Sequence, residues 1–397
     1  MIITPKIRNS VALNCHPLGC GAQVIEQINY TKQQPKFVGP KNALIIGGST
    51  GFGLASRIAL AFGADTNTLN VSFEREAGAK KTGTAGFWNN LYFQSEAKKS
   101  GLTSVDIQGD AFTDEIKTEV IATIQAQFPD GIDLLVYSVA APRRTDPETG
   151  ITYDSQLKPV GKAVEGYTLN FTTDELDYRS VEPASEEEIT ATIKVMGGED
   201  WQRWIDQLQA AGVLNHGFKT IAYSYLGPEV TYAIYQKGAL GTAKAHLAET
   251  ATVLDQQLAP LSGEAAIVVD KAIVSRASAY IPMLNLYVAT VFKVMENHGK
   301  QETTIAHKYR FFSDMLYGTH PEIDEQGFYR PDAWEMDPTI QAETNALLEQ
   351  LTPENFKDIT SYWELKHEFN MINGFDVPNV DYTTDVDLLA LITELQA

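Results

Sequence analysis

One short apolar run, followed at once by a glycine cluster, constrains the fold more than any other feature of this chain. Ala43-Leu44-Ile45-Ile46 has no polar alternation, which predicts a parallel strand covered on both faces. It leads directly into Gly47–Gly53, and the residues after that, Leu54–Phe62, have a helical pattern. A strand that passes through glycines into a helix is typical of the first unit of a nucleotide-binding α/β fold.

The same alternation of strand and helix continues along the chain. Further strands are predicted at Leu69–Phe73, Ser104–Ile107, Asp133–Ser138, Lys219–Tyr225 and Ala265–Val269. Strands that alternate with helices at this spacing predict an α/β fold with a Rossmann-like, doubly wound parallel sheet.

Changes in composition divide the chain into a core and additions to it. We predict an N-terminal arm at residues 1–41, a Rossmann-like catalytic domain at 42–299 with an insertion at about 142–198, and a C-terminal extension at 300–397 packed on the same domain. The arm is expected to contain a turn at Cys15–Cys20 and a helix around Ala22–Lys32. The extension is polar and is expected to be largely helical, with one helix starting at Thr352-Pro353-Glu354.

The charge balance limits the possible partners. With 51 acidic and 31 basic residues the net charge is -20, which disfavours nucleic acid and anionic membrane surfaces. The start of the chain lacks the apolar core of a signal peptide, and no apolar run approaches the ~20 residues that span a bilayer. Cys15 and Cys20 are too few for a disulfide framework, and with no second ligand cluster they predict no metal site. We therefore expect a cytoplasmic protein.

The glycine cluster is the predicted pyrophosphate site of a dinucleotide. Its spacing is G-x3-G-x-G, the variant found in short-chain dehydrogenases and reductases. Glycines let the backbone approach a phosphate closely, and the following helix N-terminus supplies N–H donors. Such turns also occur for packing alone, so the prediction depends on the neighbouring strand, helix and acidic residue. The cofactor-binding residues expected here are Gly47, Gly48, Ser49, Thr50, Gly51, Phe52 and Gly53.

An acidic residue at the end of the second predicted strand favours NADH. Glu74, beside Phe73, would accept hydrogen bonds from the adenosine ribose hydroxyls and repel a 2′-phosphate. Arg75, Lys80 and Lys81 lie nearby and would suit NADPH instead, so that alternative stays open. Residues at the ends of the next two strands would frame the adenine and the nicotinamide ribose, namely Asp110, Ala111, Val139 and Ala140.

Tyr235 and Lys244 are the predicted catalytic pair. A phenol and an ammonium group stabilise an enolate or alkoxide that develops beside a nicotinamide ring. The spacing is Tyr-x8-Lys, and in one continuous helix of 3.6 residues per turn the two would face opposite sides. They converge only if Tyr235 precedes the helix and the chain bends at Gly238 and Gly241. Tyr225, at the end of the preceding strand, is either a substrate contact or an aromatic wall.

Several longer motifs extend this pattern over essentially the whole chain. They are HPLGC from His16, GGSTGFGLASRIA from Gly47, SFERE from Ser72, KKTGTAGFWNN from Lys80, GDAF from Gly109, VMGGEDW from Val195, GFKTIAYSYLGPEVTYAIY ending at Tyr235, and GFDVPNVDY from Gly374. Together with Lys244 they resemble the long single-chain trans-2-enoyl reductases (NADH), the enoyl-ACP and enoyl-CoA reductases of bacterial fatty-acid synthesis.

The resemblance implies a specific reaction. NADH would deliver a hydride to Cβ of a trans-2-enoyl thioester carried by acyl carrier protein or coenzyme A, which is the last reductive step of fatty-acid elongation. Tyr235 would bind the thioester carbonyl and donate the proton, Lys244 would bind the nicotinamide ribose, and Tyr225 would contact the substrate. Members of this family generally behave as monomers.

The resemblance also implies a cover for the cofactor. Ile273, Val274 and Ser275 would close over the nicotinamide and the pyrophosphate, and Ala277–Leu286 would form a substrate-binding helix. Many members have Thr in place of Ser275 and Gln or Lys in place of Arg276. Ser275 keeps the hydroxyl, so cofactor binding is expected to persist.

Two other functions are compatible with a dinucleotide fold. A short-chain carbonyl reductase is disfavoured because no tyrosine in this segment has a lysine four residues later. A catalytically silent dinucleotide sensor is disfavoured because a sensor needs no proton donor, yet Glu74, Tyr235 and Lys244 occur together.

Overall fold

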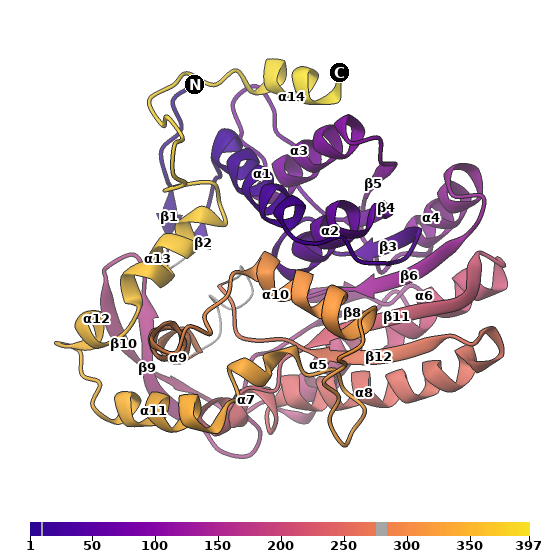
Figure 1. The fold of residues 1–397 in the computed structure, drawn as a ribbon. Helices are drawn as coiled ribbons and strands as arrows, with labels where there is room; N and C mark the ends of the chain where they lie inside the picture. Colours follow the sequence, from indigo (N-terminus) through magenta and orange to yellow (C-terminus); the bar gives the residue numbers. More distant parts are fainter. Residues whose placement is uncertain (9–10, 275–283) are drawn as a thin grey trace.

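The computed structural model describes residues 1–8, 11–274 and 284–397, and its centre is a six-stranded sheet (Figure 1). The strand order is β12-β11-β6-β3-β4-β5, and every pairing within it is parallel. This is the order of a doubly wound sheet, so the predicted fold class is confirmed. The strands are β3 (Asn42–Ile46), β4 (Asn67–Ser72), β5 (Ser104–Gln108), β6 (Ile132–Tyr137), β11 (Leu214–Ser224) and β12 (Glu264–Val269).

The central strand β3 is buried on both faces, as its apolar run predicts. Leu44 and Ile46 belong to a core shared with α4, α6 and α8, whereas Ala43 and Ile45 belong to a second core shared with α1, α2 and α10. Figure 1 shows these helices on the two sides of the sheet. Their bounds are α4 (Asp114–Gln127), α6 (Glu199–Ala210), α8 (Ala239–Leu258), α1 (Pro17–Gln33), α2 (Gly51–Ala64) and α10 (Thr304–Arg310).

The N-terminal arm differs from the prediction at one point. Cys15–Cys20 is not a separate turn, because α1 already begins at Pro17 and is longer than the helix expected around Ala22–Lys32. His16 is the N-cap, and its Nδ1 accepts a hydrogen bond from the backbone N–H of Gly19 at 3.4 Å. Proline suits this first helical position because its missing N–H would have no partner there. Before the helix, β1 (Ile7–Arg8) pairs with β2 (Val11–Ala12).

The insertion forms two small antiparallel hairpins and a helix. Ser185 and Glu188 make a reciprocal capping box at the start of that helix, which accounts for the acidic run there. The pairs are β7 (Arg143–Thr145) with β8 (Thr152–Asp154), and β9 (Val164–Asn170) with β10 (Glu175–Val181), followed by α5 (Glu186–Met196). Two further helices before the C-terminal extension are α3 (Ala85–Lys99) and η2 (Ala259–Leu261).

The C-terminal extension is largely helical, and its helices contact separate parts of the chain: α14 lies against α3, and α11 lies against α9. The helix expected at Thr352-Pro353-Glu354 does not start there; these residues form a turn, and α12 begins at Phe356. None of the helices in the described residues is both long and apolar enough to cross a membrane. The last helices are α9 (Leu284–Asn297), η4 (Phe311–Leu316), η5 (Pro331–Trp334), α11 (Pro338–Glu349), α12 (Phe356–Ile359), α13 (Tyr362–Met371) and α14 (Leu388–Gln396).

Candidate active site

The glycine loop follows β3 at the point where the strand order reverses, between β3 and β6. Gly47 has φ +89°, and a Cβ there would lie 2.3 Å from the carbonyl oxygen of Ser138. A Cβ on Gly53 would lie 2.1 Å from the carbonyl oxygen of Gly47. Both glycines are therefore required by close backbone packing within the turn.

Gly51 has a different environment from these two. Its φ is +54°, and a Cβ built on it meets nothing within 4 Å. Thr50 is the N-cap of α2, so the open space beside Gly51 lies at the N-terminus of a long helix. Backbone N–H donors and the helix dipole favour an anion in such a position. The loop therefore fits the pyrophosphate of NADH.

Two buried asparagines that the sequence interpretation did not single out hold the loop in place. The backbone N–H of Gly48 donates to Oδ1 of Asn70 at 2.8 Å, and Nδ2 of Asn89 donates to the carbonyl oxygen of Ser49 at 3.0 Å. Phe52 points inward, where its ring centroid lies 6.0 Å from that of Tyr223. Polar residues inside apolar elements were the only signal that could have identified the asparagines.

Glu74 lies beside the glycine loop, just after the end of β4. The hydroxyl of Ser49 donates to Oε1 of Glu74 at 2.7 Å. A Cβ on Gly86, in the first turn of α3, would lie 2.1 Å from the same oxygen, so the carboxylate packs closely against that helix. Phe73 is 79% exposed. Arg75, Lys80 and Lys81 are all exposed.

The other residues expected to bind the cofactor also follow strand ends, at the same edge of the sheet as the glycine loop. Asp110 follows β5, and its Oδ1 accepts the backbone N–H of Phe112 at 3.0 Å. The carbonyl oxygen of Ala111 accepts a hydrogen bond from Lys117 Nζ at 2.8 Å. After β6, Val139 is partly buried and Ala140 is exposed.

The chain between Tyr235 and Lys244 bends as the spacing requires. Tyr235 is the last residue of α7 (Tyr232–Tyr235), which follows η1 (Glu229–Thr231), and α8 starts after its N-cap, Gly238. A Cβ on Gly238 would lie 2.5 Å from the carbonyl oxygen of Ile234, and one on Gly241 would lie 2.2 Å from that of Gln236. Glycine is therefore needed at both positions for the two helical segments to meet.

Tyr235 and Lys244 both contact the end of β11. Lys244 Nζ donates to the carbonyl oxygen of Tyr223 at 3.0 Å, and the ring of Tyr235 meets the ring of Tyr225 edge to face. Burial lowers the pKa of Lys244 to about 8. The negative charge of Asp270 acts in the opposite direction and offsets part of this decrease. The ammonium group is therefore charged at neutral pH and starts to lose its proton in mildly alkaline solution.

The two phenols differ in their hydrogen bonding. Tyr225 donates to Oε1 of Glu335 at 3.1 Å, whereas the hydroxyl of Tyr235 has no hydrogen-bond partner among the described residues. Tyr235 is only 7% exposed, and burial, together with the nearby charge of Glu335, raises its pKa well above the usual value for tyrosine. Tyr235 is thus protonated at neutral pH and can donate a hydrogen bond to a ligand.

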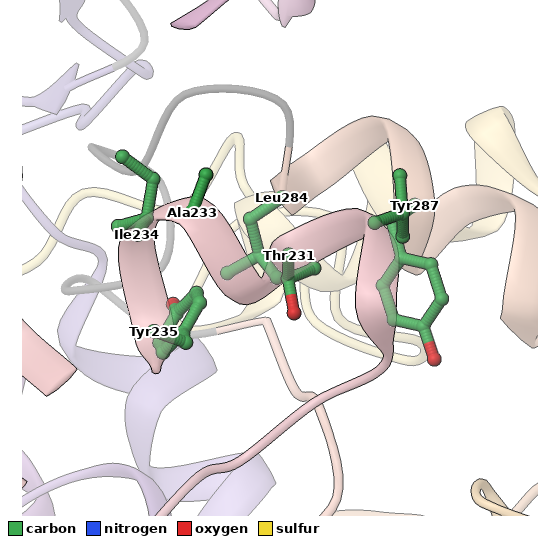
Figure 2. Close-up of a pocket in the computed structure, with 7 residues that line it drawn as sticks. Thr231, Ala233, Ile234, Tyr235, Leu284 and Tyr287 are labelled. Atoms are coloured by element: carbon green, nitrogen blue, oxygen red, sulfur yellow. The ribbon is translucent and has the colours of Figure 1, made fainter. Parts of the chain in front are cut away.

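A pocket next to Tyr235 is mostly apolar (Figure 2). One wall is the continuous turn of η1 and α7, and the other is the first turn of α9, which carries Tyr287. The polar groups in this lining are the side-chain hydroxyls of Thr231, Tyr235 and Tyr287. The lining residues are Val230, Thr231, Ala233, Ile234, Tyr235, Leu284 and Tyr287.

The segment after β12 lies against this pocket. Val274 is 9% exposed and belongs to the same apolar cluster as Tyr235 and Leu284. Ile273, beside it, is partly buried. Ser275 and Arg276, like residues 277–283 of the expected substrate-binding helix, lie outside the described residues.

The sequence patterns did not identify Glu335 or Tyr287 as residues of the site. Both phenols, Tyr225 and Tyr287, donate to Oε1 of Glu335, although Tyr225 lies 110 residues earlier in the chain. Glu335 follows η5 in the polar extension and belongs to no recognisable motif. No local pattern identifies a carboxylate that becomes buried by long-range packing.

Three protein-family models match successive parts of the chain. They are the NAD(P)H-binding domain of trans-2-enoyl-CoA reductase at residues 2–79, the trans-2-enoyl-CoA reductase catalytic region at 81–317, and the enoyl reductase FAD-binding domain at 323–386. The chain is 46% identical to an enoyl-[acyl-carrier-protein] reductase [NADH] of Cytophaga hutchinsonii, over 98% of each chain. It is also 46% identical to a trans-2-enoyl-CoA reductase [NADH] of Treponema denticola, over 98% of this chain and 99% of the relative.

Solved structures agree with these matches. A trans-2-enoyl-CoA reductase of Clostridium acetobutylicum in complex with NADH superposes with a TM-score of 0.97 at 42% identity, over 100% of both chains. The Treponema denticola enzyme in complex with NAD superposes with a TM-score of 0.94 at 46% identity, over 98% of both chains.

The name of the third family model mentions FAD, but the residues there do not fit that cofactor. Residues 323–386 are all described, and they contain no strand that leads through a glycine-rich turn into a helix. That local structure is the one that binds the pyrophosphate of a dinucleotide cofactor. Instead, Tyr362, Leu365 and Phe369 of α13 pack in the apolar cluster that contains Tyr235. Residues 323–386 therefore do not form a dinucleotide site for FAD.

Proposed function

Because the chain belongs to the trans-2-enoyl-CoA reductase family, we propose that Tyr235 and Lys244 carry out the family reaction here. The protein is an NADH-dependent oxidoreductase of fatty-acid synthesis. It reduces the trans-2 double bond of an enoyl thioester, carried by acyl carrier protein or coenzyme A, to the saturated acyl thioester.

Tyr235 is the proton donor in this proposal. When bound, NADH supplies the hydride that forms the new C–H bond at Cβ of the substrate. As the electrons of the double bond move toward the thioester carbonyl, Tyr235 donates a hydrogen bond to the oxygen that gains negative charge. The phenol then gives up its proton, which ends at Cα, and a proton from solvent restores the phenol. Burial favours this role because it keeps Tyr235 protonated until the charge develops.

Lys244 binds the nicotinamide ribose and offsets the negative charge that forms beside it. Its contact with the carbonyl oxygen of Tyr223 at 3.0 Å directs the ammonium group toward the end of β11. Tyr225 forms an aromatic wall against Tyr235 and contacts the substrate through its ring, since its hydroxyl donates to Glu335.

The glycine loop, Glu74 and the strand ends bind the cofactor. Glu74 accepts from the adenosine ribose, as its position beside Ser49 supports. The pyrophosphate lies in the open space beside Gly51, and Ile273 and Val274 cover the nicotinamide side. Asp110, Ala111, Val139 and Ala140 line the cofactor between these two ends.

We also propose that the enzyme works as a cytoplasmic monomer. Residues 42–299 form the catalytic unit, and residues 1–41 and 300–397 pack on it. The chain has only two cysteines, too few for a disulfide framework, which suits a reducing compartment. Light scattering behind a sizing column tests the monomer, because a mass of two chains would contradict it.

The observation that carries the proposed residue roles is the free hydroxyl of Tyr235 at the wall of an apolar pocket. The test is NADH oxidation with crotonyl-CoA and with a longer trans-2-enoyl-CoA, each repeated with the Tyr235→Phe variant. Consumption of NADH should depend on the enoyl thioester and should collapse in the variant. Binding of NADH without any turnover of enoyl thioesters would overturn the proposal.

A further inference from the structure

One buried carboxylate of the C-terminal extension accepts hydrogen bonds from three separate segments of the site. Glu335 is 1% exposed and directly follows η5. Its Oε1 accepts hydrogen bonds from Tyr225 at 3.1 Å and from Tyr287 at 2.7 Å. Its Oε2 accepts the backbone N–H of Ala272 at 2.6 Å. A buried carboxylate needs several donors, and here all of them come from outside the extension.

Each of these three partners belongs to a different part of the site. Tyr225 follows β11, and its ring centroid lies 4.7 Å from that of Tyr235. Ala272 belongs to the segment after β12 and is followed directly by Ile273 and Val274. Tyr287 is on α9 and lines the apolar pocket, where Figure 2 shows it together with Tyr235. Glu335 therefore connects the wall beside the proton donor, the cover of the cofactor and the wall of the acyl pocket.

A second polar side chain keeps this arrangement in one orientation. Gln341 Nε2, on α11, donates to the phenol oxygen of Tyr287 at 3.0 Å and to the backbone carbonyl of Glu335 at 2.7 Å. With its oxygen accepting from Gln341, Tyr287 donates its own proton to Glu335. Tyr225 also donates to Glu335, so neither of these hydroxyls is available as a donor to the thioester carbonyl. Tyr235 is left to do so.

We propose that Glu335 is a positioning residue for enoyl reduction, and that through it the C-terminal extension completes the active site. This inference rests on the proposed roles of Tyr235 and Tyr225. Glu335 acts through the two phenols and the backbone of Ala272, without contacting the reacting atoms. It holds the ring of Tyr225 against Tyr235, so that the phenol of Tyr235 meets the substrate carbonyl in one geometry.

A double-mutant cycle with Glu335→Gln and Tyr225→Phe tests this role. Glutamine keeps the shape of the side chain but replaces one accepting oxygen with a donor group. We expect Glu335→Gln to lower kcat with crotonyl-CoA by about tenfold or more, while the KM for NADH changes by less than about twofold. Because the hydroxyl of Tyr225 acts through its contact with Glu335, the double variant should lose little more than Glu335→Gln alone. Losses that multiply would overturn the proposal, as would a kcat of wild-type size.

Asp332→Asn is the matched control for general loosening of the extension. Asp332 precedes Glu335 by one helical turn and is equally buried, but its oxygens accept from Arg330, both at 2.8 Å. This variant should lower the melting temperature and leave kcat within about twofold of the wild type. An equal loss of kcat in both variants would make Glu335 merely structural and overturn the inference.

Two further results keep the test decisive. If Glu335→Gln does not accumulate as folded protein, Glu335→Asp keeps the charge but withdraws the oxygens by one methylene group, and a wild-type kcat in that variant would overturn the role. Failure of the proposed function looks different, because wild-type enzyme would then fail to oxidise NADH with any enoyl thioester. If the wild type and Tyr235→Phe turn over equally, the assignment of Tyr235 falls, and the role of Glu335 falls with it.

Discussion

The ring of Tyr225 meets the ring of Tyr235 at an angle of 81°, with 4.7 Å between the two centroids. The two phenols look interchangeable in the sequence, but their hydroxyl groups have different surroundings. The hydroxyl of Tyr225 donates to Glu335, whereas the hydroxyl of Tyr235 has no partner among the described residues. The two side chains are therefore expected to have different tasks. Tyr225 is held by Glu335 and packs against Tyr235, whereas the hydroxyl of Tyr235 is left to react with the substrate.

Removing the hydroxyl of Tyr235 should abolish most of the activity. We expect Tyr235→Phe to lower kcat by roughly 10²- to 10⁴-fold, the usual contribution of a general acid, and to leave NADH affinity nearly unchanged. Tyr232→Phe, which removes a phenol from the same short helix outside the pocket lining, is the control. Steady-state kinetics and NADH fluorescence titration measure both effects. Equal kcat values in the two variants would remove Tyr235 from the mechanism.

Lys244→Met should weaken both cofactor binding and turnover. Its ammonium group lies at the end of β11, where the nicotinamide ribose is proposed to bind, so its loss removes a charge-assisted hydrogen bond. We expect the Kd for NADH to rise about tenfold. Lys237→Met is the control, since Lys237 is exposed just before α8. If NADH binds Lys244→Met and the wild type equally well, Lys244 does not bind the cofactor.

The pH dependence of kcat/KM for NADH should follow the protonation state of Lys244. Burial lowers its pKa to about 8, so the group is charged below that pH and neutral above it. The charged form binds the cofactor, and kcat/KM for NADH should therefore fall as pH rises through about 8 in the free enzyme. In Lys244→Arg the side chain stays charged, and this decline should disappear. A decline that persists in Lys244→Arg would have to come from another group.

Glu74→Ala should narrow the preference for NADH over NADPH. The carboxylate repels the 2′-phosphate of NADPH, and the exposed Arg75 next to it can attract that phosphate once the carboxylate is gone. We expect the ratio of kcat/KM values for the two cofactors to change by about tenfold or more. Glu76→Ala, at an exposed acid two residues later, should leave the ratio unchanged. An unaltered ratio in Glu74→Ala would place selectivity elsewhere.

Two glycines of the loop should respond differently to alanine. In Gly53→Ala the new Cβ would lie 2.1 Å from the carbonyl oxygen of Gly47, so the backbone must shift and the melting temperature should fall by several degrees. In Gly51→Ala nothing lies within 4 Å of the Cβ. Strain from positive φ should cost only about 1 kcal/mol, but the methyl group enters the proposed pyrophosphate space and should raise the KM for NADH. The opposite pattern would place the cofactor elsewhere.

Features that depend on neighbouring residues were predictable from the order of amino acids. The apolar run of β3, the glycine loop and the capping box at Ser185 all follow from local backbone and side-chain chemistry. The bend between Tyr235 and Lys244 was predictable as well, because helical geometry excludes a straight connection. The turn expected at Cys15–Cys20 was wrong, because the helix-starting preference of Pro17 was overlooked.

Only the tertiary structure placed Glu335. Its three donors come from β11's end, the segment after β12, and α9, and no periodicity links residues as far apart as Tyr225 and Glu335. Burial then changed the chemistry of the groups that met there, lowering the pKa of Lys244 and raising that of Tyr235. Local sequence specifies backbone conformation, since its interactions span a few residues. Long-range packing alone decides which charged and phenolic groups share a water-poor space, and therefore how they react.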